Sequence, residues 1–192
     1  MPFQHAPDVA TQPLPEKEQY TYADYAELSE GAPYELIAGD LVMAPSPTFR
    51  HQQVSLRLSA AIFRHAEQHG GGEVVAAPMD VSLSEETTVQ PDLIYVASER
   101  RKIISEQRIH GAPDLIVEIL SPSTAHRDIG IKKRLYEQHG VREYWTVDPE
   151  SQAVEIHVNT ESGFQQQARV VESGSAASTV IDGFRVDIAE LF

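Results

Sequence analysis

Hydrophobic positions between about Arg50 and His69 recur every three to four residues. They are Val54, Leu58, Ala61, Ile62 and His65. This spacing predicts an amphipathic helix with one buried face, and the three glycines at 70–72 end it. Three arginines of the same segment, Arg50, Arg57 and Arg64, recur at intervals of seven residues. They therefore form a second stripe along this helix.

Most other hydrophobic residues lie in short runs that are typical of strands. The predicted strands cover about 34–38, 41–44, 73–77, 79–84, 89–96, 113–120, 141–147, 154–158, 164–171 and 179–181. The first two are expected to form a hairpin that turns through Gly39-Asp40. Residues 154–158 alternate between apolar and polar side chains, which predicts that Glu155, His157 and Asn159 face solvent.

Helical segments are expected at four further places. They are a short helix from the cap at Thr21 to about Leu28, a charged connection over 100–110, a helix over about 123–139, and a last turn over 187–192. Together these elements indicate an α/β protein of α+β-like character, with a mixed central β-sheet flanked by helices. A single domain over 20–192 follows a proline-rich polar leader over 1–19.

Composition narrows the functional classes. The chain has no cysteine, which excludes disulfides, thiolate zinc sites and cysteine nucleophiles. It has no apolar run long enough to span a membrane and no signal-peptide pattern. Because cysteine is absent, a reducing cytoplasm is the expected location. The net charge of −14 comes from residues 1–48 and 143–192, whereas 49–142 is neutral. Strong nonspecific DNA binding is therefore not expected.

Glu118 is the most informative residue, because it lies inside the apolar strand predicted over 113–120. A buried carboxylate costs several kcal/mol unless a cation or hydrogen bonds compensate it. One interpretation is a structural ion pair. The other is a catalytic site, since Asp92 opens a neighbouring predicted strand and Lys132 lies on the following helix. Two carboxylates and a lysine are typical of metal-dependent phosphodiester hydrolysis.

Asp92 follows Pro91 at the start of a strand, where it could either cap a turn or bind a metal ion. If the strands of Asp92 and Glu118 are neighbours, both carboxylates can reach one hard cation such as Mg²⁺. Lys132 could form an ordinary surface salt bridge with Asp128, four residues earlier. It could also point back toward the acidic site and stabilise a phosphate transition state.

Further candidates lie earlier in the chain. Glu35 is either a solvent-facing strand residue or a third carboxylate, and His51 at the start of the long helix could face the cleft. Asp80 could add a metal ligand or an outer contact. Tyr136 is interpreted as a packing residue or an outer contact.

The order of several segments resembles the Uma2 family of bacterial proteins. The segments are Tyr34–Asp40, Pro45–Pro47 with His51, Pro91–Leu93, Val117–Thr124, the helical Asp128, Lys132 and Tyr136, and Gly140–Trp145 with Asp148-Pro149. The resemblance covers roughly residues 20–160. This family belongs to the PD-(D/E)xK restriction-endonuclease-like superfamily, which implies that fold.

The resemblance also implies roles for individual residues. Asp92 and Glu118, with the backbone carbonyl of Ile119, would bind Mg²⁺ or Mn²⁺, and Glu35 would be an additional acid. The superfamily pattern places a lysine two residues after the second acid, where this chain has Leu120. The lysine is displaced to the following helix, and Lys132 is the matching position. Lys133 points about 100° away from that face.

The sequence therefore predicts a metal-dependent endonuclease that hydrolyses DNA phosphodiester bonds. Asp92, Glu118 and Lys132 would carry catalysis, with support from Glu35 and His51. DNA binding is expected to be weak or dependent on DNA structure. The alternative is a nuclease-fold binding or assembly module with little or no catalysis, which the acidic charge favours. A metal-dependent hydrolase with a substrate other than DNA is a third interpretation. Edge strands near the C-terminus allow a homodimer.

Overall fold

A mixed six-stranded sheet forms the centre of the computed structural model, which describes residues 16–29, 31–69 and 71–192. Its strands, in spatial order, are β11 (Gly163–Val171), β10 (Ala153–Thr160), β9 (Glu143–Asp148), β8 (Leu115–Ile119), β6 (Leu93–Val96) and β3 (Glu73–Ala76). Strands β8 and β9 are parallel and the other neighbours are antiparallel. Residues 1–15 of the predicted leader lie outside the described residues.

A second sheet has five strands. In spatial order they are β2 (Asp40–Met43), β1 (Tyr34–Ile37), β5 (Thr87–Val89), β4 (Asp80–Ser84) and β7 (Arg108–His110). Strands β1 and β2 form the predicted hairpin, but Ile37 pairs with Asp40, so the turn is Ala38-Gly39. Both turn residues have positive φ angles, 51° and 87°, as a two-residue turn of this kind requires.

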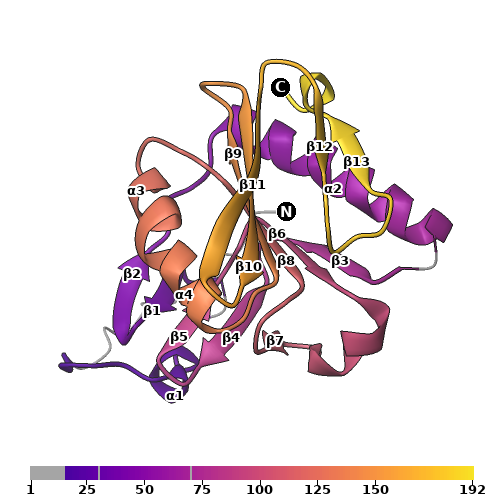
Figure 1. The fold of residues 1–192 in the computed structure, drawn as a ribbon. Helices are drawn as coiled ribbons and strands as arrows, with labels where there is room; N and C mark the ends of the chain where they lie inside the picture. The colour runs from indigo at the N-terminus through magenta and orange to yellow at the C-terminus, as the bar shows by residue number, and fades with distance from the viewer. Residues whose placement is uncertain (1–15, 30, 70) are drawn as a thin grey trace, which may run out of the picture.

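Helices cover both faces of the six-stranded sheet (Figure 1). Helix α2 (Phe49–His69) lies on one face beside the hairpin of β12 (Ser175–Ala177) and β13 (Arg185–Asp187). On the other face a continuous helical segment consists of α3 (Ala125–Arg127), the π-turn η2 (Asp128–Lys132) and α4 (Lys133–Gln138). Short helical turns complete the fold: α1 (Tyr22–Tyr25), η1 (Ser98–Ile103) and η3 (Ile188–Glu190).

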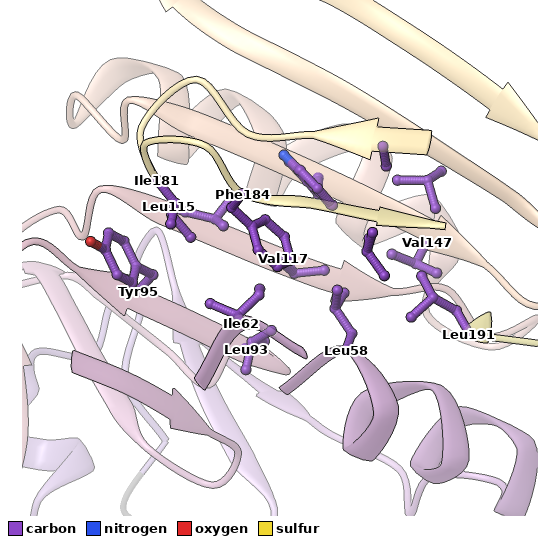
Figure 2. Packing of buried hydrophobic residues seen from close by; sticks show 14 of the residues in the cluster. Leu58, Ile62, Leu93, Tyr95, Leu115, Val117, Val147, Ile181, Phe184 and Leu191 are labelled. Carbon is purple, nitrogen blue, oxygen red and sulfur yellow. The ribbon is translucent and has the colours of Figure 1, made fainter. Parts of the chain in front are cut away.

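Alternation along β8 separates two hydrophobic clusters. Leu115, Val117 and Ile119 pack on the α2 side, where Figure 2 shows Leu58 and Ile62 next to the sheet. Ile116 packs on the opposite side, with Tyr136 of α4. Since side chains alternate along a strand, Glu118 lies on the same side as Ile116. The buried carboxylate therefore faces η2 and α4.

The predicted fold class is confirmed, and four predicted elements need correction. Residues 89–96 are not one strand, because the chain passes at Gln90–Asp92 from the five-stranded sheet into β6. Residues 100–110 form a 3₁₀ turn followed by β7, and the helix predicted over 123–139 contains a π-turn. Residues 179–181 are not a strand. Within the part of the chain that the structure describes, no helix is long and apolar enough to cross a membrane.

The prediction that the polar side chains of 154–158 face solvent is wrong for His157. Its side chain is buried beside the rings of Tyr144 and Phe164, on the face of the six-stranded sheet against which α4 packs. Its Nδ1 atom has no hydrogen-bond partner among the residues that the structure describes. Burial lowers the pKa of His157, and the positive charge of Lys133 lowers it further.

This environment predicts an acid-sensitive contribution to stability. The histidine pKa is about 6.5 in the unfolded chain and lower in the fold. As the pH falls through about 6.5, the unfolded chain takes up a proton that folded His157 resists, so the free energy of unfolding decreases. Chemical denaturation at about pH 7.5 and pH 5 should therefore show a smaller decrease for His157→Phe than for the wild type. The exposed control His110→Gln should keep the wild-type decrease, and equal decreases in all three proteins would contradict the prediction.

Candidate active site

A cavity of about 510 Å³ lies where the two sheets meet. The predicted site residues that line it are Glu35, His51, Asp92, Glu118, Ile119 and Lys132. They come from β1, α2, the connection before β6, β8 and η2, five places far apart in the sequence. The structure thus brings together all of the residues that were predicted for the site.

The ammonium group of Lys132 lies at the centre of this cluster. Its Nζ atom is 2.6 Å from Oε1 of Glu118 and 3.0 Å from Oε1 of Glu35. Asp128, four residues earlier on η2, is 3.7 Å away. Lys132 is only 3% exposed. The surface salt bridge with Asp128 that the sequence allowed is therefore a buried contact within a larger cluster.

The π-turn η2 helps to place these groups. The backbone N–H of Lys133 donates to the carbonyl of Asp128, five residues earlier, and the hydroxyl of Tyr144 donates to the same carbonyl at 3.0 Å. One turn later, the hydroxyl of Tyr136 donates to Oε1 of Glu118 at 2.6 Å. Such π-turns occur frequently at functional sites. Here the turn carries the ammonium and one of the carboxylates.

Asp92 is held by two other parts of the fold. Its Oδ2 atom accepts a hydrogen bond from the backbone N–H of Ile119 at 2.7 Å and lies 3.2 Å from Nε2 of His51. The Ile119 contact ties Asp92 to the residue that directly follows Glu118. Burial lowers the pKa of His51, but Asp92 and the carbonyl of Ile119 outweigh this effect, so the pKa is raised.

Glu35 links the five-stranded sheet to the cluster. Its Oε1 atom accepts a hydrogen bond from the backbone N–H of Gln90 at 2.8 Å, in addition to its contact with Lys132. The side chain of Gln90 donates to Asp80 at 2.9 Å, and Tyr25 donates to the same Asp80 oxygen. Asp80 is therefore an outer contact and not a lining residue of the cavity.

The cluster contains more negative than positive charge. Four carboxylates, those of Glu35, Asp92, Glu118 and Asp128, line a cavity with one buried ammonium. Burial raises the pKa of Glu118 well above its ordinary value, and although Lys132 opposes this effect, the other three carboxylates reinforce it. The carboxylates of Glu118, Glu35 and Asp128 outweigh the effect of burial on Lys132, so the pKa of Lys132 is raised and its ammonium stays charged. A proton or a bound cation would relieve the excess negative charge.

The donor set fits a hard divalent cation that keeps part of its water. Among residues 16–29, 31–69 and 71–192, no three or more histidine, aspartate and glutamate side chains are arranged as a metal cluster. Two carboxylates, Asp92 and Glu118, are nevertheless sufficient for Mg²⁺, which usually binds one or two carboxylates and retains several waters. The uncompensated negative charge around Glu118 is the observation that favours such an ion.

The rim of the cavity is polar. Hydroxyl groups come from two loops, and the lining residues are Ser46 and Thr48 before α2, and Ser121, Ser123 and Thr124 before α3. Arg127 also lines the cavity and donates to the backbone carbonyl of Met43 at 2.9 Å. The helix after β8 begins next to the acidic cluster, where hydroxyl, amide and guanidinium donors suit an anionic ligand.

Sequence reasoning gave too little weight to Asp128 and Tyr136. Both contact the groups that were predicted to be catalytic, and both are buried. The available signal was their spacing of four residues on either side of Lys132, which places all three on one helical face. Asp114 precedes β8, the strand that carries Glu118, and is also a buried carboxylate. It forms ion pairs with Arg100 and Arg142, at 3.0 Å each, and these pairs are structural and lie away from the cavity.

Because Lys132 is buried, its substitution should affect the stability of the fold. The variant Lys132→Ala leaves several buried carboxylates without their cation. We expect it to lower the free energy of unfolding by about 3–5 kcal/mol, measured by urea denaturation at neutral pH. The matched control Lys133→Ala, on the next and partly exposed position, should cost less than about 1 kcal/mol. Equal losses would show that the Lys132 cluster does not stabilise the fold.

Comparisons with known proteins identify the family and the fold of this chain. The model of the Uma2 family, described as "putative restriction endonuclease", matches residues 20–189. A solved structure with the same fold is a putative nuclease belonging to DUF820 from Anabaena variabilis ATCC 29413, with a TM-score of 0.73 and 19% identity over 90% of this chain and 97% of that chain. No curated protein matches the chain. Because the family model covers nearly the whole described chain, the protein belongs to the Uma2 family.

Proposed function

We propose that the protein is a metal-dependent endonuclease that hydrolyses DNA phosphodiester bonds with Mg²⁺ or Mn²⁺. The observation that carries this proposal is the convergence of Asp92, Glu118 and Lys132 in one cavity with a surplus of negative charge. The description of the family model and the shared fold with the protein from Anabaena variabilis, which is described as a putative nuclease, support it. We also propose the cytoplasmic location that was expected from the sequence.

In this proposal Asp92, Glu118 and the backbone carbonyl of Ile119 hold the metal ion. Such an ion, when bound, lowers the pKa of water and stabilises the negative charge that develops on phosphate oxygens. His51 and the N–H of Ile119 orient Asp92 through their contacts with its Oδ2 atom. Tyr136 orients Glu118 through the 2.6 Å hydrogen bond to its Oε1 atom.

Lys132 acts at the reacting phosphate. Its ammonium stays charged because of the surrounding carboxylates, so it can position the attacking water or stabilise the charge of the transition state. Glu35 and Asp128 hold the ammonium in place. Hydroxyl groups at the rim and Arg127 are suitably placed to bind the neighbouring phosphates of a strand.

A second candidate function is a binding or assembly module with little or no catalysis. The observation in its favour is the direct contact between Lys132 and Glu118, which uses a proposed metal ligand as a structural partner. The net charge of −14 also opposes tight binding to a polyanion. A homodimer through the exposed edge of β11 would be compatible with either function, and DNA binding is expected to be weak or dependent on DNA structure.

Cleavage assays test the enzymatic proposal. Supercoiled plasmid and single-stranded DNA should be cleaved with Mg²⁺ or Mn²⁺ and not with EDTA, and Glu118→Gln should lower the rate at least about a hundredfold, because it removes a ligand charge. The exposed control Glu86→Gln should retain wild-type activity. Cleavage that survives in Glu118→Gln would exclude this carboxylate from the catalytic centre.

Metal binding can be measured without any nucleic acid. Titration calorimetry should detect Mn²⁺ binding to the wild type, and Asp92→Asn should weaken it about tenfold or more, since one of two charged ligands is lost. Binding without cleavage would indicate a different substrate or a missing partner. No heat of binding in the folded wild type would instead favour the assembly module.

A further inference from the structure

The outer face of helix α2 exposes large hydrophobic side chains. Phe49 is 79% exposed, Leu56 is 71% exposed and Phe63 is 50% exposed. They are seven residues apart, so they follow one line along the helix that drifts by only about 20° per interval. The opposite face of α2 is fully used by the core, where Val54, Leu58 and Ile62 are buried. The exposed hydrophobic line is therefore not part of the core and does not stabilise the fold by burial.

A line of arginines runs beside this hydrophobic line. Arg50, Arg57 and Arg64 each follow one of the three hydrophobic residues, are exposed, and lie about 100° around the helix from them. Helix α2 has three arginines and one glutamate, Glu67, in a chain whose net charge is −14. The helix thus presents positive charge on an otherwise acidic protein, which indicates an anionic partner.

The N-terminal end of this surface lies next to the candidate active site. Thr48, His51 and Ser55 line the cavity, and Phe49 and Arg50 lie between them in the sequence at the start of α2. Figure 1 shows α2 on the outside of the sheet, extending away from the region of β1 and β2. From Phe49 to Phe63 the line is about 21 Å long at the helical rise. A ligand along α2 would therefore reach the cavity at one end.

We propose that this face of α2 binds a single-stranded nucleic-acid segment and leads it to the cavity. Bases stack on Phe49 and Phe63, and phosphates contact Arg50 and Arg64. Exposed aromatic rings next to a positively charged stripe are the two features that single-strand binding requires. The guanidinium of Arg57 contributes less, because it already donates to the carbonyls of Leu191 and Phe192. This inference rests on the proposed nuclease function and adds the form of its substrate.

Two other occupants fit the surface less well. A second copy packed antiparallel on α2 would place Arg57 against Arg57 and Arg50 against Arg64, and such like-charge contacts are unfavourable. Duplex DNA keeps its bases stacked inside the helix, so it would use the arginines and leave the phenylalanines without a partner. An unstacked strand engages both lines of side chains.

Binding in EDTA separates this inference from catalysis. Fluorescence anisotropy with labelled oligodeoxythymidylate should detect binding that weakens about five- to hundredfold in Phe49→Ala or Phe63→Ala, the effect typical of losing one stacked base. Arg50→Ala should lower the slope of log K against log salt by about 0.7. The control Val171→Ala, at an exposed position on β11, should bind as the wild type does.

The outcomes discriminate between the two proposals. Strand binding that depends on Phe49 and Phe63, without cleavage under any metal, would support the surface and refute the nuclease. Metal-dependent cleavage with unchanged strand affinity in both phenylalanine variants would support the nuclease and overturn the surface. A wild-type dimer in light scattering that becomes monomeric in Phe49→Ala or Phe63→Ala would also overturn it, because the line would then be a protein interface.

Discussion

The buried ammonium of Lys132 is the interaction on which the site depends. It contacts carboxylates from β1, β8 and η2 at 2.6–3.7 Å, so it joins both sheets and the helix that follows β8. Each carboxylate alone would be costly to bury at this place. The ammonium of Lys132 offsets part of the cost of burying these carboxylates, but an excess of negative charge remains. This excess of negative charge is unfavourable for folding, but it favours the binding of a divalent cation in the cavity.

The meeting of two sheets explains where this site lies. Glu118 is near the end of β8, and Asp92 lies in the short connection through which the chain leaves the five-stranded sheet and enters β6. The hydrogen bond from the N–H of Ile119 to Asp92 fixes the position of Asp92 relative to Glu118, the residue before Ile119. Groups at strand ends remain accessible from the cavity while the rest of each strand is buried. This arrangement combines a rigid scaffold with accessible carboxylates.

Helix α2 has three surfaces with different tasks. Its inner face packs on the six-stranded sheet, its first turn supplies His51 to the cavity, and its outer face presents two parallel lines of phenylalanine or leucine and of arginine. The period of the helix separates these lines, so mutations on the outer face leave the core and the cluster untouched. The tests of substrate binding and of catalysis can therefore be made independently.

Local pattern in the sequence determined the mixed α/β class, the amphipathic face of α2 and the suspicion that Glu118 needs a partner, because these follow from periodicity and from the cost of a buried charge. Only the tertiary structure decided that residues 89–96 belong to two sheets, that His157 is buried beside Tyr144 and Phe164, and that Glu35 is a buried carboxylate. It also decided that Lys132 lies among several acids and not at the surface. Sequence spacing limits distances within one element, whereas contacts between distant segments depend on how the sheets pack against each other.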